Sequence, residues 1–166
     1  PLTFAYEKVQ ALLAYLAVEA GRVHRRTALA ELLWPEQDEA VARHNLSQAL
    51  YNLRRALRDD PDNPLLLTTR ETVCLNPASS VWVDVAAFRA LGCGANSGTL
   101  QLEQAIELYR GEFLEGSSSG DSADFEEWAL VLREQLHVQA GDVLQRLTDP
   151  EGGVADPSRR RDYARR

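Results

Sequence analysis

The sequence predicts a mainly α-helical fold in two parts: three helices and a β-hairpin, followed by an all-helical second half. Two observations support this fold class. Apolar residues recur every three or four positions both before residue 58 and after residue 83, which is typical of amphipathic helices. Between them, residues 65–77 are rich in β-branched and apolar residues around a polar centre, which is typical of a short hairpin. A chain of 166 residues is long enough for one domain of ordinary size or two small ones.

Two short helices open the first part. The first is predicted to end at Gly21, because glycine commonly follows the last turn of a helix. Its apolar residues follow helical spacing: Val9, Leu12, Leu13, Leu16, Ala17 and Ala20. The second helix is predicted from about Thr27 to Trp34, and Pro35 ends it because proline disfavours helical backbone in the residue before it.

The third helix, at about residues 38–58, is the longest of the first part. Asp38 is of a type that favours the N-cap position, and "DDPDNP" at 59–64 ends the helix with prolines and turn formers. Two short strands then fold about Arg70 and Glu71, although the turn lacks the Asn-Gly or Asp-Gly pair that favours tight hairpins. This order of elements is that of a winged helix-turn-helix domain, which we assign to residues 1–77 with the hairpin as its wing.

The second half, residues 78–166, is predicted to be a helical domain. Helices are expected in "VDVAAFRALG" (83–92) and from Thr99 to Tyr109, and "GSSSGDS" (116–122) is expected to be a loop with nothing to pack against. The strongest helix follows, with apolar residues at Phe125, Trp128, Leu132, Leu136, Ala140, Val143 and Leu147. "DPSRRRDYARR" begins a further helix whose apolar face is incomplete, so we expect the chain to be truncated here. Paired helices with short breaks are similar to a helical-repeat array, although no fixed period is clear.

Charge is distributed unevenly along the chain. The formal net charge is −7, and residues 1–77 have 9 Lys and Arg against 10 Asp and Glu, whereas residues 78–166 have 9 against 15. A local cationic face can therefore still bind a polyanion, because exposed charges beyond about 10 Å are largely screened at moderate salt. Two cysteines and three scattered histidines provide neither a disulfide framework nor a metal site. With no membrane-spanning apolar run, we expect a cytoplasmic protein with no metal, no cofactor and no membrane partner.

The third helix carries the candidate functional residues, since "RHNLSQALYNLRRALR" (43–58) has four arginines and no carboxylate. Its leucines at 46, 50, 53 and 57 share one side. The opposite side presents His44, Gln48, Tyr51 and Arg55, flanked by Asn52 and Arg58. Arg can bond guanine, Gln and Asn can bond adenine, and Tyr and His can reach phosphates, so this side suits a DNA major groove. Arg54 points sideways, and Arg70 at the hairpin tip is placed to reach the DNA backbone or minor groove.

Other interpretations stay open at this point. An arginine-rich exposed face is often only a solvated surface. A protein-interaction module whose winged helix has lost DNA binding would fit the net charge of −7. An enzyme is not expected, because the sequence has no paired base and nucleophile, no metal-ligand spacing and no phosphate loop.

Several phrases resemble the antibiotic regulatory protein (SARP) type of bacterial transcriptional regulators. They cover nearly the whole chain in that family's order: "ALLAYLA", "LAELLWP", "ARHNLSQALYNLRRAL", "LNPASSVWVDVAAFRAL", "LYRGEFLEG" and "DFEEWALVLREQL". The resemblance implies an OmpR-like winged helix followed by a bacterial transcriptional activation domain (BTAD) similar to tetratricopeptide repeats (TPR). It also implies that the helix matching Val41–Arg58 enters the major groove and that the hairpin matching Leu65–Leu75 is the wing.

The resemblance also implies partners. Members of this family are activators that bind tandem direct repeats at promoters as dimers, and their helical domain mediates self-association and contacts RNA polymerase or its sigma factor. We expect the chain to depart from the family at three places. The small N-terminal antiparallel sheet is expected to be missing or cut short, and the chain is expected to end inside a further repeat. In addition, "SSSG" at 117–120 stands where the family often has apolar or aromatic residues.

Overall fold

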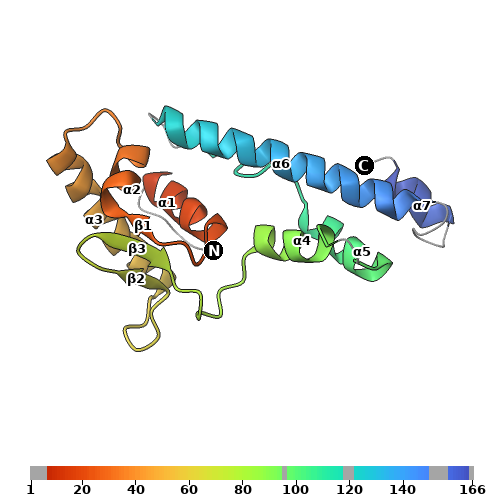
Figure 1. The fold of residues 1–166 in the computed structure, drawn as a ribbon, viewed down its shortest axis with the longest axis horizontal. Helices are drawn as coiled ribbons and strands as arrows, with labels where there is room; N and C mark the ends of the chain where they lie inside the picture. The colour runs from red at the N-terminus through yellow and green to blue at the C-terminus, as the bar shows by residue number, and fades with distance from the viewer. Residues whose placement is uncertain (1–6, 95–96, 118–121, 150–156, 165–166) are drawn as a thin grey trace. The chain divides into compact units, whose positions relative to one another are not determined.

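The computed structural model describes residues 7–94, 97–117, 122–149 and 157–164 (Figure 1). The chain forms two compact units. The first, called the N-terminal unit below, consists of Pro1–Val81 and Gly116–Trp128, and the second, the helical unit, consists of Trp82–Glu115 and Ala129–Arg166. The predicted division into domains between residues 77 and 78 is a statement about which parts of the chain fold independently, and it stays a prediction. The sheet expected before the first helix falls on residues 1–6, which lie outside the described residues.

Three helices of the N-terminal unit follow the predicted order. They are α1 (Glu7–Val18), α2 (Arg26–Leu33) and α3 (Glu39–Leu57). Gly21 lies in the turn after α1 with φ of 82°, a left-handed conformation that glycine adopts without steric cost. Asp38 is the N-cap residue of α3, and its backbone carbonyl accepts a hydrogen bond from the Ala42 amide. Its side chain makes no capping hydrogen bond, so the backbone alone begins the helix.

A three-stranded antiparallel sheet with the order β1-β3-β2 completes the N-terminal unit (Figure 1). The strands are β1 (His24–Arg25), β2 (Leu66–Thr68) and β3 (Thr72–Leu75). The predicted hairpin is confirmed, and its register pairs Leu66 with Leu75 and Thr68 with Val73. The sequence does not predict β1, because two polar residues are too short to show an alternating pattern. This strand pairs with β3 through His24 and Val73.

The leucines of α3 lie at the centre of the core of this unit. Leu46 and Leu53 are fully buried and Leu50 is nearly so, as predicted, whereas Leu57 in the last turn is half-buried. Buried side chains from α1, α2 and the sheet surround them: Leu12, Leu16, Leu29, Leu33, Leu66 and Val73. Burial of one leucine contributes about 1.5–3 kcal/mol relative to exposure. This apolar side therefore fixes the rotation of α3 and leaves the opposite side facing outward.

One end of the segment at 116–122 packs into the N-terminal unit, so the expectation that this loop has nothing to pack against is wrong at Ser122. The Ser122 side chain is fully buried, and its hydroxyl donates to the backbone carbonyl of Leu32 and accepts from the amide of Phe125. Ser122 directly precedes α6 (Ala123–Thr148) and satisfies one of the free amides of the first turn, as an N-cap residue does. Residues 118–121 lie outside the described residues.

The first turns of α6 pack against α1. Phe125 is buried, and its ring centroid lies 5.2 Å from that of Trp128. The Trp128 ring centroid lies 4.8 Å from that of Tyr15 in α1. Such aromatic pairs add about 0.5–1.5 kcal/mol beyond the burial of their area. A short segment distant in sequence is therefore part of the N-terminal unit.

The helical unit confirms the prediction of an all-helical second half among the described residues. It contains α4 (Asp84–Gly92), α5 (Thr99–Leu108), most of α6, and α7 (Pro157–Tyr163). Gly92 permits close packing, because a Cβ there would lie 2.8 Å from Val143 Cγ2 and 3.3 Å from Ala105 Cβ. Arg146 of α6 donates to the backbone carbonyls of Gly92 and Ser97 and so satisfies groups near the end of α4. No helix in the described part of the chain is long and apolar enough to cross a membrane.

Candidate nucleic-acid interface

The outward side of α3 presents four polar side chains in one row. His44, Gln48, Tyr51 and Arg55 follow one another at steps of four, three and four, and all four are exposed. Tyr51 is 58% exposed although it is a large aromatic residue. The row spans about 16 Å along the helix axis, at about 1.5 Å per residue. We call these four residues the outward row.

The outward row carries cationic charge without a carboxylate. The Arg55 guanidinium carbon lies 5.8 Å from the centroid of the Tyr51 ring, which is a cation–π contact. Within the described part of the chain, the Arg55 side chain makes no hydrogen bond and no ion pair; its backbone carbonyl accepts a hydrogen bond from the Arg58 amide. Its five N–H donors are therefore available to an external acceptor, such as the edge of guanine or a phosphate.

Two predicted residues border the outward row. Asn52 is half-buried at its edge. Arg58 is exposed and follows the last helical residue, with φ of 53° and ψ of 46°. This left-handed conformation ends α3, and the Arg58 amide donates to the carbonyls of Arg54 and Arg55. Arg58 therefore extends the cationic surface beyond the helix end.

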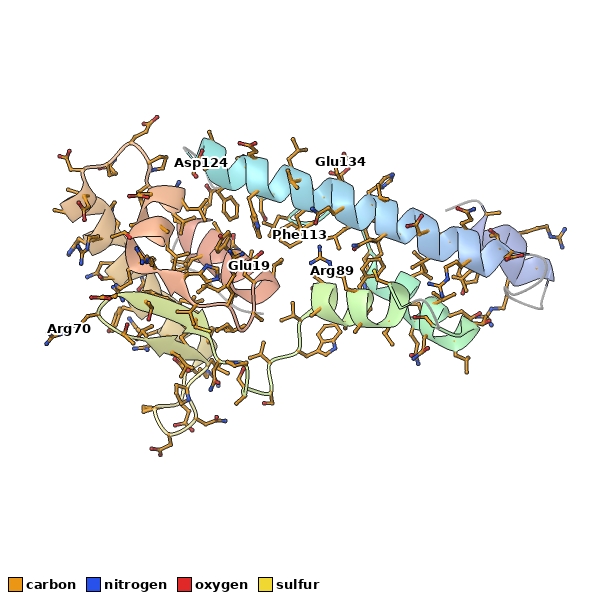
Figure 2. All side chains as sticks on the ribbon, viewed as in Figure 1. Glu19, Arg70, Arg89, Phe113, Asp124 and Glu134 are labelled. Carbon is orange, nitrogen blue, oxygen red and sulfur yellow. The ribbon has the colours of Figure 1, made fainter. Side chains whose placement is uncertain are left out.

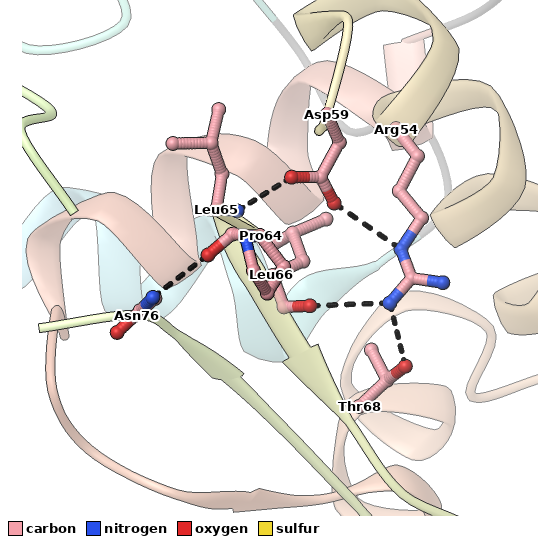
Figure 3. A network of polar contacts seen from close by, with 7 residues as sticks. All are labelled: Arg54, Asp59, Pro64, Leu65, Leu66, Thr68 and Asn76. Carbon is pink, nitrogen blue, oxygen red and sulfur yellow. Dashed lines mark hydrogen bonds and ion pairs between the residues drawn. The ribbon is translucent and has the colours of Figure 1, made fainter. Parts of the chain in front are cut away.

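Arg54 points sideways from the outward row, as predicted, and binds β2 (Figure 3). Its Nη2 donates to the backbone carbonyl of Leu66 at 3.1 Å and to Thr68 Oγ1 at 2.7 Å. Its Nε lies 3.4 Å from a carboxylate oxygen of Asp59, whose side chain is only 5% exposed. The same carboxylate accepts a hydrogen bond from the Leu65 amide. Arg54 therefore joins the last turn of α3 to the first strand of the hairpin.

The turn of the hairpin presents Arg70, which projects away from the sheet (Figure 2). The Thr69 side-chain oxygen accepts hydrogen bonds from the amides of Glu71 and Thr72 and lies 2.8 Å from the Thr72 hydroxyl. The Thr69 amide also donates to the Thr72 carbonyl at 2.9 Å. Threonine side chains thus stabilise a turn that lacks the usual glycine, and they hold Arg70 at its tip.

Three polar residues near the hairpin are not singled out by the sequence: Arg26 at the start of α2, and Arg43 and Ser47 of α3. Arg26, Arg43 and Ser47 line a concave surface together with Thr68, Thr69 and Arg70. Arg43 and Ser47 lie on the flank of α3 that faces the hairpin, about 100° from the middle of the outward row. Their spacing of four residues is visible in the sequence, but the approach of Arg26 depends on tertiary packing across 21 residues.

A protein-family model matches the part of the chain that contains the outward row and the hairpin turn. Residues 6–73 match the family model described as "Transcriptional regulatory protein, C terminal", which spans α1, α2, α3 and the hairpin turn. This is a DNA-binding regulatory family and not an enzymatic one, and the match supports a DNA-binding bacterial transcriptional regulator. No curated protein is detectably similar to the chain. The residues that the structure describes include no group of three or more His, Cys, Asp or Glu able to hold a metal ion.

Proposed function

We propose that this chain is a sequence-specific transcriptional activator whose α3 lies in the DNA major groove. The outward row carries the proposal, because it presents Gln48 and Arg55 to solvent on a helix whose other side is buried in the core. Gln recognises adenine and Arg recognises guanine through pairs of hydrogen bonds. His44 and Tyr51 are placed to contact phosphates beside these bases, and Asn52 borders the same row.

The wing and the helical unit complete the proposal. Arg70 at the hairpin tip reaches the DNA backbone or the minor groove, and Arg58 adds a phosphate contact at the end of α3. The resemblance to SARP regulators supports a BTAD-type, TPR-like helical unit that mediates self-association and contacts RNA polymerase or its sigma factor. On this proposal a dimer or higher oligomer binds promoter repeats in the cytoplasm, at the nucleoid.

An alternative function is a protein-interaction module that no longer binds DNA. The acidic second half favours this alternative, since residues 78–166 have 9 Lys and Arg against 15 Asp and Glu. An acidic helical surface suits a basic partner, and like charge repels DNA phosphates. The two functions differ in whether the intact chain binds DNA at low salt.

Selection of bound sequences from a random pool of duplex DNA tests the proposal. We expect an enriched motif, and we expect Gln48→Ala and Arg55→Ala each to weaken binding of the selected site about 10- to 100-fold. Gln10→Ala is a matched control, because Gln10 is an exposed residue on α1 outside the outward row. Unchanged melting temperatures would show that the losses concern recognition and not folding. No enrichment, together with no binding at low salt, would exclude the proposal and favour the alternative.

A further inference from the structure

A cationic concave surface lies between α2, α3 and the hairpin, beside the outward row. Six residues line it: Arg26, Arg43, Ser47, Thr68, Thr69 and Arg70. Three carry guanidinium groups, three carry hydroxyl groups, and the lining includes no carboxylate. We call this surface the arginine notch. Its chemistry is that of an anion site, since guanidinium groups carry a positive charge and donate several hydrogen bonds each to phosphate oxygens.

Hydrogen bonds hold the arginine notch in a fixed shape. Arg26 Nη2 donates to Ser47 Oγ at 2.8 Å, and Ser47 Oγ donates to the Arg43 backbone carbonyl at 2.9 Å. The Arg26 amide donates to the Glu71 carbonyl at 2.8 Å, which ties the start of α2 to the hairpin. The Arg26 guanidinium is therefore oriented before any ligand arrives, and a ligand has less side-chain entropy to remove.

The charges of the arginine notch are incompletely balanced. Burial, and then the neighbouring charges of Arg43 and Arg54, lower the pKa of Arg26, which still stays fully protonated at neutral pH. Arg43 lies 3.4 Å from Glu39, but both side chains of this pair are more than half exposed. Such an exposed pair is weak and does not prevent Arg43 from binding another anion. A phosphate between Arg26 and Arg43 would relieve the repulsion that Arg26 experiences.

We infer that the arginine notch binds one phosphate of the DNA backbone and so sets the position of α3 in the groove. This inference rests on the proposed function. A base edge is a poorer ligand for the arginine notch than a phosphate. Arg26 and Ser47 already make hydrogen bonds within the protein, and the notch offers few acceptors for the donor groups of a base. Phosphate contacts position a protein on DNA without reading its sequence. Arg26 and Arg43 are therefore positioning residues, distinct from the base-reading residues Gln48 and Arg55.

The salt dependence of binding tests this inference in the intact chain. Arg26→Ala is expected to weaken binding of the selected site and of random DNA by the same factor, about 3- to 10-fold, and to reduce the slope of log Kd against log salt by about 0.9. Arg26→Lys keeps the charge and should restore most of the slope. Arg22→Ala is the matched control, because it removes one positive charge from an exposed arginine outside the notch. It should leave the slope nearly unchanged.

A single neutral methylphosphonate, placed in turn at each backbone position of the selected DNA, locates the contact. The wild-type chain should lose affinity when the methylphosphonate replaces one particular phosphate. The Arg26→Ala chain should bind that modified DNA as well as it binds the unmodified DNA. If the wild-type chain binds no DNA, the proposed function fails and the inference fails with it. If it binds DNA but Arg26→Ala keeps the wild-type slope, or loses affinity only for the selected site, the inference alone is overturned. Arg26-dependent binding of inorganic phosphate, with DNA binding unaffected by Arg26→Ala, would also overturn it.

Discussion

Two sides of α3 differ in what their side chains contact. The outward row has a contact within itself, the cation–π contact between Arg55 and Tyr51, and its polar groups face solvent. The flank that faces the hairpin is tied to other elements, since Ser47 binds Arg26 and Arg54 binds β2. Arg54 and Arg55 are consecutive residues, yet one joins two elements and the other is available to a ligand. Arginine content alone therefore says little about which residues bind DNA.

The difference has a mechanical reason. A helix that reads bases must present its side chains at a fixed distance and rotation, because hydrogen bonds weaken steeply with misalignment. The buried leucines set the rotation of α3, and Arg54 joins its last turn to the hairpin. The contacts of one side thus fix the orientation of the other side, which reads DNA on the proposed function. Arg54→Ala should therefore act mainly on stability, whereas substitutions on the outward row should act mainly on affinity.

The largest expected effect on stability is that of Arg54→Ala. This substitution removes both hydrogen bonds to β2 and leaves the buried Asp59 carboxylate without its cation. Because Arg54 is 43% exposed, solvent screens part of the loss, and we expect the free energy of unfolding to fall by about 1–2 kcal/mol. Chemical denaturation of the intact chain measures this change. Arg55→Ala is the matched control and should alter stability by less than about 0.5 kcal/mol.

A double-mutant cycle with Asp59→Asn separates the ion pair from the remaining contacts of Arg54. The introduced amide can still accept the hydrogen bond of the Leu65 backbone N–H, but it carries no charge. We expect Arg54→Ala to cost less in the Asp59→Asn background than in the wild-type chain. Equal losses in both backgrounds would show that the ion pair contributes nothing. Equal stability of Arg54→Ala and Arg55→Ala would remove the distinction between the two sides.

A smaller effect is expected on the outward row from Tyr51→Leu. The Tyr51 ring orients Arg55 through a contact at 5.8 Å, and such exposed cation–π contacts contribute about 0.5–1 kcal/mol. Affinity for the selected DNA should therefore fall about 2- to 5-fold in an equilibrium binding titration. Tyr51→Phe retains the ring and should lose less affinity than Tyr51→Leu, because it gives up only the proposed phosphate contact of the hydroxyl. If both variants lose the same affinity, Tyr51 acts through its hydroxyl, as a phosphate contact, and not through Arg55.

The outward row could be predicted from the sequence because local spacing determines it. Once Leu46, Leu50 and Leu53 are assigned to the core, the helical period places Gln48 and Arg55 on the opposite side. The hairpin and the order of helices also follow from periodicity and from proline and glycine positions. These features depend on residues within a few turns of one another, so a single sequence contains them.

The contacts that hold the outward row in place could not be predicted in the same way. Arg54 meets Thr68 across 14 residues, Arg26 meets Ser47 across 21, and Ser122 meets Leu32 across 90. No local pattern links such pairs, because their approach results from the packing of the leucine core. The apolar period of α6 predicts its buried side, but it does not show that its first turns pack against Tyr15.

The last expected effect is that of pH on stability, and it arises from a buried residue of the N-terminal unit and not from the outward row. At neutral pH it is the smallest of the expected effects. His24 of β1 is buried, its Nε2 has no hydrogen-bond partner among the described residues, and its ring lies 5.2 Å from that of Tyr15. Burial is the main cause that lowers the pKa of His24 below its usual 6.5; Arg22 lowers it further, while Glu19 opposes the change. The unfolded chain therefore binds a proton at a higher pH than the folded chain does. Stability should be complete above about pH 6.5 and should fall as the pH decreases below that value.

Thermal melts between pH 7.5 and pH 5.5 measure this dependence. His24→Phe keeps an aromatic ring beside Tyr15 and removes the titrating group, so its melting temperature should fall less over this range than that of the wild-type chain. His44→Gln is the matched control, since His44 is exposed on the outward row, and it should retain the wild-type dependence. If His24→Phe retains the wild-type pH dependence instead, a group other than His24 is responsible. Carboxylates with ordinary pKa values would not account for it, because they titrate mainly below this range. If His44→Gln removes it, the outward row is coupled to folding, and the separation between the two sides of α3 does not hold.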